Sequence, residues 1–158
     1  MEIRIEDFAA REVIFTRRVG AYAQSAPQAW QALWAWVASQ GHGEKIKRVI
    51  GIGWDSPAHT PAAECRYDAC MELHEPVAGD PDLDIALQTL PGGMHAVHRM
   101  VGPYHQMPDT IMELLDSTLP ERGLIVDPVR PVLEIYVNDP TQVPETDLLT
   151  DLCIPIET

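Results

Sequence analysis

The sequence predicts an α+β fold: a tandem strand-helix-strand-strand duplication forming a mostly antiparallel sheet, with helices on one face and a ligand cleft on the other. Two observations predict this fold. Short runs rich in β-branched and aromatic residues alternate with two helical segments. Landmarks of the first half recur in the second half, in the same order, at an offset of 82 or 83 residues.

The repeated landmarks predict one domain, residues 1–158, made of two pseudo-symmetric halves of about 1–75 and 83–158. A pseudo-twofold axis between such halves would create a groove on the open face of the sheet, a natural ligand site. The matching pairs are Val19-Gly20-Ala21-Tyr22 with Val101-Gly102-Pro103-Tyr104, Gly41 with Gly123, Asp55-Ser56-Pro57 with Asn138-Asp139-Pro140, Pro61 with Pro144, and Asp68-Ala69-Cys70 with Asp151-Leu152-Cys153.

Each half is expected to build its strands around one helix. The first helix is predicted from Ser25 to Gly41, because Ser25 and Gln28 have capping-box spacing and Pro27 suits a first turn. Its predicted apolar face is Trp30, Leu33, Trp34 and Val37; that of the second helix, from Pro108 to Leu119, is Ile111, Leu114, Leu115 and Leu119. The strands are predicted at 3–8, 11–19, 49–54, 64–73, 85–90, 94–101, 131–137 and 147–156.

Composition excludes several classes of function. A net charge of −13 speaks against direct nucleic-acid binding, which needs clustered Lys and Arg. No run is long and apolar enough to span a membrane, and no signal peptide is apparent. Cys65, Cys70 and Cys153 lie in apolar runs, so we expect reduced core residues of a cytoplasmic protein. His95 and His98 would face opposite sides of a strand, so no metal site is expected, and no cofactor motif occurs.

The strand from Pro131 to Pro140 carries the most unusual residue pattern of the chain. Alternation places Glu134 and Tyr136 on one face and Leu133 and Ile135 on the other. An acid and a phenol are poor core residues, whereas a partly buried carboxyl without a fixed cation acquires a raised pKa. Such a group can select cationic or hydrogen-bonding ligands, or act as a general acid or base. The first face is therefore expected to point towards a pocket.

The two halves differ at this face. Under the offset of 83, Glu134 corresponds to Gly51 and Tyr136 to Gly53, so we expect open space for a ligand opposite the carboxylate. Two alternatives remain open: the glycines mark a bulge or close strand packing, and Glu134 pairs with Arg66 or Arg99. Three tyrosines and one tryptophan would suit flat, lipophilic cations through stacking and cation–π contact, namely Tyr22, Tyr104, Tyr136 and Trp54.

Several of these motifs, in their order along the chain, resemble the GyrI-like small-molecule-binding domain, the effector-binding domain of AraC-type regulators, which also occurs as a free-standing protein. The resemblance covers essentially the whole chain. The motifs are the paired Val-Gly-x-Tyr segments, Ile50-Gly51-Ile52-Gly53, Cys65-Arg66-Tyr67-Asp68-Ala69-Cys70, Leu90-Pro91-Gly92-Gly93, Leu133-Glu134-Ile135-Tyr136-Val137-Asn138-Asp139-Pro140, and Thr150-Asp151-Leu152-Cys153-Ile154-Pro155.

The resemblance implies that Glu134 lies at the floor of a central cleft and contacts lipophilic cations, with Tyr22, Tyr104 and Tyr136 as lining residues. Other members are hydrolases of strained cyclopropane-type toxins, which would make Glu134 and Tyr104 catalytic, and others inhibit DNA gyrase. Because the chain starts at Met1 with a strand-like segment, the free-standing form is expected. Binding module, hydrolase and protein-interaction role all remain open, as does a homodimer.

Overall fold

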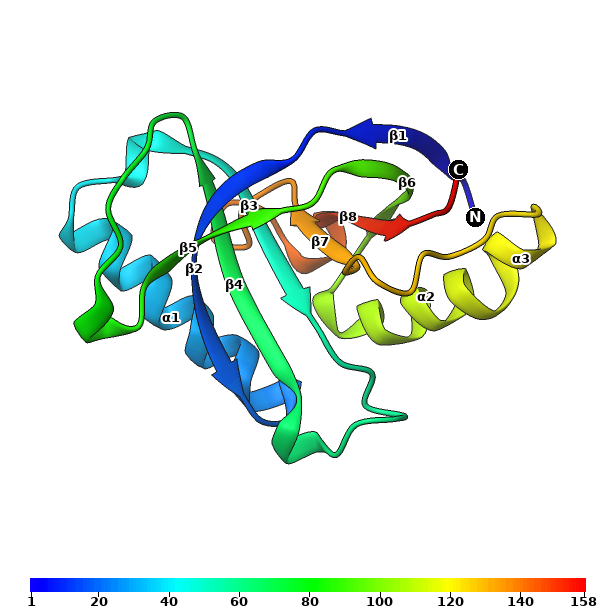
Figure 1. Cartoon of the computed structure of the whole chain (residues 1–158), viewed down its shortest axis with the longest axis horizontal. Helices are drawn as coiled ribbons and strands as arrows, with labels where there is room; N and C mark the ends of the chain where they lie inside the picture. The colour runs from blue at the N-terminus through cyan, green and yellow to red at the C-terminus, as the bar shows by residue number, and fades with distance from the viewer. The chain divides into compact units, whose positions relative to one another are not determined.

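The computed structural model describes residues 1–158, which form two compact units. The first unit is residues 11–90, and the second is residues 1–10 together with residues 91–158. Each unit contains one antiparallel four-stranded sheet and one helical segment (Figure 1). The α+β class predicted from the sequence is confirmed.

The first unit has the strand order β3-β4-β2-β5, with every neighbouring pair antiparallel. Its single α-helix, α1, follows β2. The bounds are β2 (Arg11–Val19), α1 (Tyr22–Ser39), β3 (Ile46–Gly53), β4 (Arg66–Leu73) and β5 (Ala86–Leu90), with 3₁₀ turns at Gly43–Lys45, Ala62–Glu64 and Pro81–Leu83.

The second unit has the strand order β1-β6-β8-β7, again antiparallel throughout. Because β1 pairs with β6, the first strand of the chain belongs with the later half, so the compact units and the sequence halves have different boundaries. The bounds are β1 (Arg4–Phe8), β6 (Gly93–Val101), α2 (Met107–Glu113), a π-helical turn (Leu114–Thr118), α3 (Leu119–Glu121), β7 (Leu133–Tyr136) and β8 (Leu149–Pro155), with 3₁₀ turns at Tyr104–Gln106 and Glu145–Asp147.

The predicted duplication is confirmed by equivalent strands and equivalent turns. Strands β3, β4 and β2 of the first unit take the places of β7, β8 and β6 in the second. Gly20 and Gly102 both have positive φ, +144° and +126°, in the turn that leads to the helix. Their amides donate to Cys65 and Leu148, 83 residues apart, at 2.9 and 2.8 Å. A glycine suits both turns because side chains rarely adopt such angles.

Helix α1 differs from its prediction at its start and in its buried face. It begins at Tyr22, three residues before the expected cap, because the amides of Gln24 and Ser25 already bond to Ala21. Ser25 is thus buried within the helix. The buried stripe is Ala29, Leu33, Trp36 and Val37, while Trp34 is 45% exposed. The buried stripe is rotated by part of a turn from the predicted one, so Trp36 is buried in place of Trp34. Helical periodicity alone does not fix this rotation.

The second helical segment buries the face that the sequence predicts. Leu114 and Leu119 are fully buried, and Ile111 and Leu115 pack partly against them. They cover the face of the sheet that carries Leu152 and further apolar residues of β6 and β8, namely Ala96, Met100 and Ile154.

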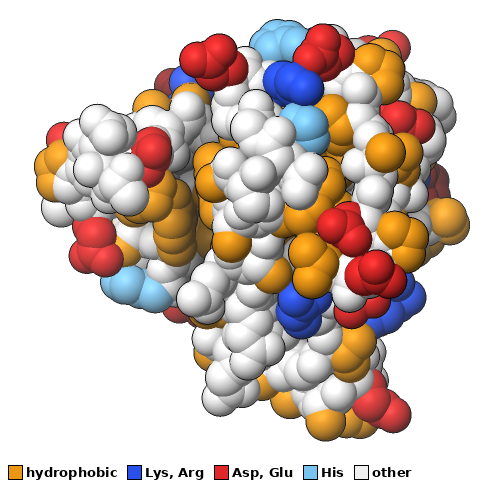
Figure 2. Space-filling model, turned by 90° about the vertical axis from the view of Figure 1, so that its left-hand side faces the viewer, with side chains coloured by type: hydrophobic (Ala, Val, Ile, Leu, Met, Phe, Trp, Pro, Cys, Tyr) orange, Lys and Arg blue, Asp and Glu red, His pale blue; other side chains and the backbone are white.

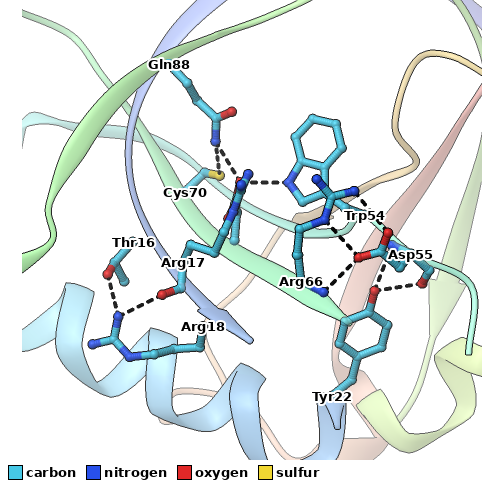
Figure 3. A network of polar contacts seen from close by, with 10 residues as sticks. Thr16, Arg17, Arg18, Tyr22, Trp54, Asp55, Arg66, Cys70 and Gln88 are labelled. Carbon is cyan, nitrogen blue, oxygen red and sulfur yellow. Dashed lines mark hydrogen bonds and ion pairs between the residues drawn. The ribbon is translucent and has the colours of Figure 1, made fainter. Parts of the chain in front are cut away.

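A buried aspartate ties neighbouring strands together in each unit. Asp68 of β4, fully buried, accepts two hydrogen bonds from Arg17 of β2 at 2.7 and 2.9 Å, and further bonds from Trp54 and Gln88. Figure 3 labels the three donors. Asp151 of β8 accepts two in the same way from Arg99 of β6, at 2.8 and 3.0 Å. The equivalence of the two pairs supports a structural role for both acids.

Acidic side chains outnumber basic ones in this protein. Red carboxylates outnumber blue Lys and Arg side chains on the face shown in Figure 2, as a net charge of −13 requires. Single apolar side chains, such as Leu83 and Leu87, are exposed. None of the helices has both the length and the apolar character needed to cross a membrane.

We expect Asp68→Asn to lower the free energy of unfolding by about 3–5 kcal/mol, because it leaves the Arg17 guanidinium without its charge partner in a buried network. Urea denaturation followed by tryptophan fluorescence measures the change. Asp116→Asn, at an exposed helical position, is the matched control and should change stability by less than about 0.5 kcal/mol. A loss below about 1 kcal/mol for Asp68→Asn would show that the network contributes little.

Candidate functional site

Strand β7 places Glu134 and Tyr136 on the face of the sheet that the helical segment covers. In the β7–β8 ladder, Glu134 lies opposite Leu152, and Tyr136 lies opposite Thr150. Opposed residues of an antiparallel pair project to the same face, and Leu152 packs against Leu114 and Leu119. The carboxylate is thus on the helix side, whereas the sequence predicts a cleft on the opposite side. Strand alternation separates two faces but does not reveal which one the helix covers.

The Glu134 carboxylate is half-buried and has no hydrogen-bond or ion-pair partner. Burial without compensation raises its pKa to about 7. The alternative in which it pairs with Arg66 or Arg99 is wrong, since Arg66 bonds to Asp55 at 2.9 Å and Arg99 to Asp151 at 2.8 Å. At neutral pH the group is therefore poised between its acid and its carboxylate form.

Two tyrosines meet in the same unit, and one of them, Tyr136, is two residues from Glu134 on the same face of β7. The rings of Tyr104 and Tyr136 have centroids 5.2 Å apart and an interplanar angle of 73°, an edge-to-face contact. Tyr104 comes from the 3₁₀ turn before α2, and burial raises the pKa of its hydroxyl. Two of the predicted aromatic residues are thus brought together, next to an acid on the same strand as one of them.

Thr150 is a residue of this face that the sequence did not single out. It lies opposite Tyr136, is fully buried, and its hydroxyl has no hydrogen-bond partner. The signal was present in the repeat, because under the offset of 83 Thr150 corresponds to Tyr67, a much larger side chain.

In the first unit the equivalent position is occupied by protein. A Cβ atom on Gly53 would lie 3.2 Å from the ring of Tyr22, so the space above this glycine is filled by the tyrosine and is not open as the sequence predicts. The Tyr22 hydroxyl donates to the carbonyl of Asp55 at 2.7 Å and accepts from its amide at 2.9 Å (Figure 3). Burial raises the pKa of Tyr22 to about 12, so it stays protonated.

The remaining predicted residues, Gly51 and Trp54, take part in strand packing and in the polar network. Gly51 is buried opposite Ala69 in the β3–β4 ladder. The indole of Trp54 donates to Asp68 at 2.7 Å, on the opposite face from Gly53, which lies opposite Tyr67. Tyr22, Gly53 and Trp54 are therefore each engaged within the first unit.

A cavity of about 470 Å³ lies elsewhere in the second unit, along the first residues of the chain. Two of its cationic side chains are already paired, because Arg4 and Arg99 share Asp151, and Arg122 donates to the carbonyl of Met1. Glu134 is not among the residues that line it, which are Met1, Glu2, Ile3, Arg4, Val97, His98, Arg99 and Arg122. Glu134 differs from these groups because it is a half-buried carboxylate with neither a hydrogen bond nor an ion pair.

Glu134→Gln should change how stability depends on pH. The folded chain holds the Glu134 proton more tightly than the unfolded chain, so its contribution to the free energy of unfolding falls as pH rises from about 4.5 to about 7. The variant should lack this fall and be more stable than the parent at pH 8, by up to about 3 kcal/mol. Urea denaturation at pH 5 and pH 8 measures it; a stability difference that does not vary with pH would contradict the raised pKa.

The chain has curated relatives along much of its length. It is 31% identical over 147 residues to a protein named DNA gyrase inhibitor from Serratia proteamaculans, covering 88% of each chain. It is 31% identical over 109 residues to the probable transcriptional regulator YgiV of Escherichia coli, covering 69% of this chain and 67% of that protein.

Solved structures share the fold at low identity. The C-terminal domain of EcmrR matches 99% of this chain and 98% of its own, with a TM-score of 0.76 and 11% identity. SAV2435 bound to tetraphenylphosphonium matches 99% of this chain and 94% of its own, with a TM-score of 0.59 and 14% identity. The family described as GyrI-like small molecule binding domain matches residues 1–157, and the chain belongs to this family.

Proposed function

We propose that this protein binds amphipathic, cationic or lipophilic small molecules against the helix-side face of β7, with the Glu134 carboxylate as charge partner. The observation that carries the proposal is that the Glu134 carboxylate is half-buried and has no ion-pair partner. The two other acids at the centre of a sheet, Asp68 and Asp151, are held by arginines, whereas Glu134 has no cation of its own. A ligand cation would supply the missing partner and recover part of the cost of burying the charge.

The aromatic neighbours fit the same class of ligand. Tyr136 shares the strand face of the acid and packs on Tyr104, and a cation near an aromatic face is attracted by the ring quadrupole. SAV2435, which shares the fold, binds tetraphenylphosphonium, a large lipophilic cation. The family itself is one of small-molecule-binding domains. Multidrug-type recognition of flat or bulky cations is the function that these features support best.

We expect Glu134→Gln to weaken binding of tetraphenylphosphonium at pH 8 by at least about 30-fold, because loss of one partner of a desolvated charge pair costs about 2–5 kcal/mol. For the parent protein, binding at pH 6 should be about tenfold weaker than at pH 8, because protonation near pH 7 removes the negative charge. Isothermal titration calorimetry measures both effects.

Glu121→Gln, at an exposed position of the same unit, is the matched control and should bind as the parent does. Equal affinity of the parent and Glu134→Gln at both pH values would remove the proposed role of the acid. Failure of the parent to bind any lipophilic cation would remove the proposed function itself.

Inhibition of DNA gyrase is a second candidate, favoured by relatives that carry this name at 31% and 33% identity. An acidic surface would meet basic surfaces of a protein partner, and such binding weakens steeply with salt. We expect purified protein to reduce gyrase supercoiling in a gel assay at low salt and to lose this effect at high salt. Unchanged supercoiling at a tenfold molar excess would exclude this candidate.

A hydrolytic reaction at the same acid is a third candidate. A carboxyl with a pKa of about 7 can give and take a proton near neutral pH, and Tyr104 lies beside Tyr136 on the same face. Two solved structures with this fold are described as hydrolases from Listeria innocua. Mass spectrometry of a cyclopropane-containing electrophile after long incubation with the protein tests this candidate. If the compound is unchanged, hydrolysis is excluded and binding is the remaining function.

A cytoplasmic location is part of the same proposal. Cys65, Cys70 and Cys153 are buried and none forms a disulfide, and burial raises the pKa of the Cys70 thiol well above its ordinary value. Unreactive buried thiols of this kind suit a reducing compartment.

A further inference from the structure

The hydroxyl of Thr150 is the second polar group on the Glu134 face without a partner. Thr150 is fully buried in β8, and its Oγ has no hydrogen bond. Buried polar atoms are nearly always bonded, so each exception calls for an explanation by water, a ligand or function. Thr16, equally buried in the first unit, follows the rule, since its hydroxyl accepts a hydrogen bond from Arg18 at 2.8 Å.

Its place in the sheet ties this hydroxyl to the candidate site. Thr150 lies opposite Tyr136 in the β7–β8 ladder and opposite Met100 in the β6–β8 ladder. Glu134 is its diagonal neighbour on the same face, a relation in which residues are about 7–8 Å apart. Two unpartnered polar groups, one acid and one hydroxyl, therefore share one face of two adjacent strands.

In the first unit, the polar group at the equivalent position has a hydrogen-bond partner within the protein. There Tyr67 takes the place of Thr150, and the indole of Trp30 donates to its hydroxyl at 2.8 Å. The second unit has a short threonine instead of the tyrosine, and Met112, 49% exposed, at the position that corresponds to Trp30 under the offset of 82. The second unit therefore lacks the indole donor of the first unit but still has a hydroxyl group at the equivalent strand position.

We propose that Thr150 determines which ligands the site accepts, by forming a hydrogen bond to a polar atom of a ligand whose cationic group faces Glu134. The inference rests on the function proposed above. The ligand class is an amphipathic cation that also carries an amino, hydroxyl or carbonyl group away from its charged centre. A threonine hydroxyl both donates and accepts, so each of these groups is a suitable partner.

Access to the hydroxyl requires a side chain to move, because Oγ is covered in the structure. Tyr136 lies directly opposite, is only half-buried and packs edge-to-face on Tyr104, so its displacement together with that ring is the movement that we propose. Tyr136 would then line the ligand after it moves.

The test compares two permanent cations on the parent protein and on Thr150→Val, which removes the hydroxyl and retains the branched shape. Ethidium carries two exocyclic amino groups, and tetraphenylphosphonium carries no hydrogen-bonding group. Thr150→Val should bind ethidium about 5–10-fold more weakly, the usual effect of one hydrogen bond, and tetraphenylphosphonium within twofold of the parent. Ethidium fluorescence and calorimetry measure the two affinities at pH 8.

A stability measurement separates this role from a structural one. Thr150→Val should melt at the same temperature as the parent or higher, because it removes an unsatisfied buried group, whereas Thr16→Val should melt lower. A lower melting temperature for Thr150→Val, unchanged ethidium affinity, or equal weakening of both cations would each overturn the inference. If the parent binds neither cation, the proposed function fails as well; if it binds both through Glu134 and Thr150→Val has no effect, only this inference fails.

Discussion

Burial of one carboxylate without a partner is the constraint on which the candidate site depends. Each sheet already has an acid at its centre, Asp68 or Asp151, and both are held by a bidentate arginine from the neighbouring strand. Desolvation of those acids is compensated within the fold. Glu134 lacks such compensation, and burial alone raises its pKa to about 7. The protonation state of Glu134 therefore depends on the pH of the solution and on the charge of a bound ligand.

The duplication explains how a small chain can hold such a group. Two units with the same strand order need not carry the same face, since each has its own helix and its own core. The first unit fills its helix side with aromatic side chains, and Tyr22 covers Gly53. The second unit presents an acid, a threonine and two tyrosines at corresponding places. One copy therefore retains full packing while the other accepts the cost of polar groups in its core.

The sequence predicts the fold well because its signals are local or repeated. Strand alternation, the repeated glycines Gly20 and Gly102 before the helices and the offset of 82–83 residues are all readable without coordinates. The start of α1 is predicted three residues late, because Ser25 resembles a cap while the backbone closes its first turn upstream. The exchange of Trp34 for Trp36 in the buried stripe has a similar origin, since a small rotation of a helix leaves its periodicity unchanged.

The sequence by itself determined the α+β class and the duplication, because these follow from patterning along the chain. It also determined that Glu134 is an acid in an apolar strand with a glycine at the equivalent position of the other half. Only the tertiary structure decided which face of β7 the helix covers and that Tyr22 fills the space over Gly53. It also showed that Arg66 and Arg99, the alternative partners of Glu134, bind Asp55 and Asp151. It alone revealed the unpartnered hydroxyl of Thr150. The physical reason is that alternation specifies two faces, whereas burial and hydrogen bonding depend on residues brought from distant parts of the chain.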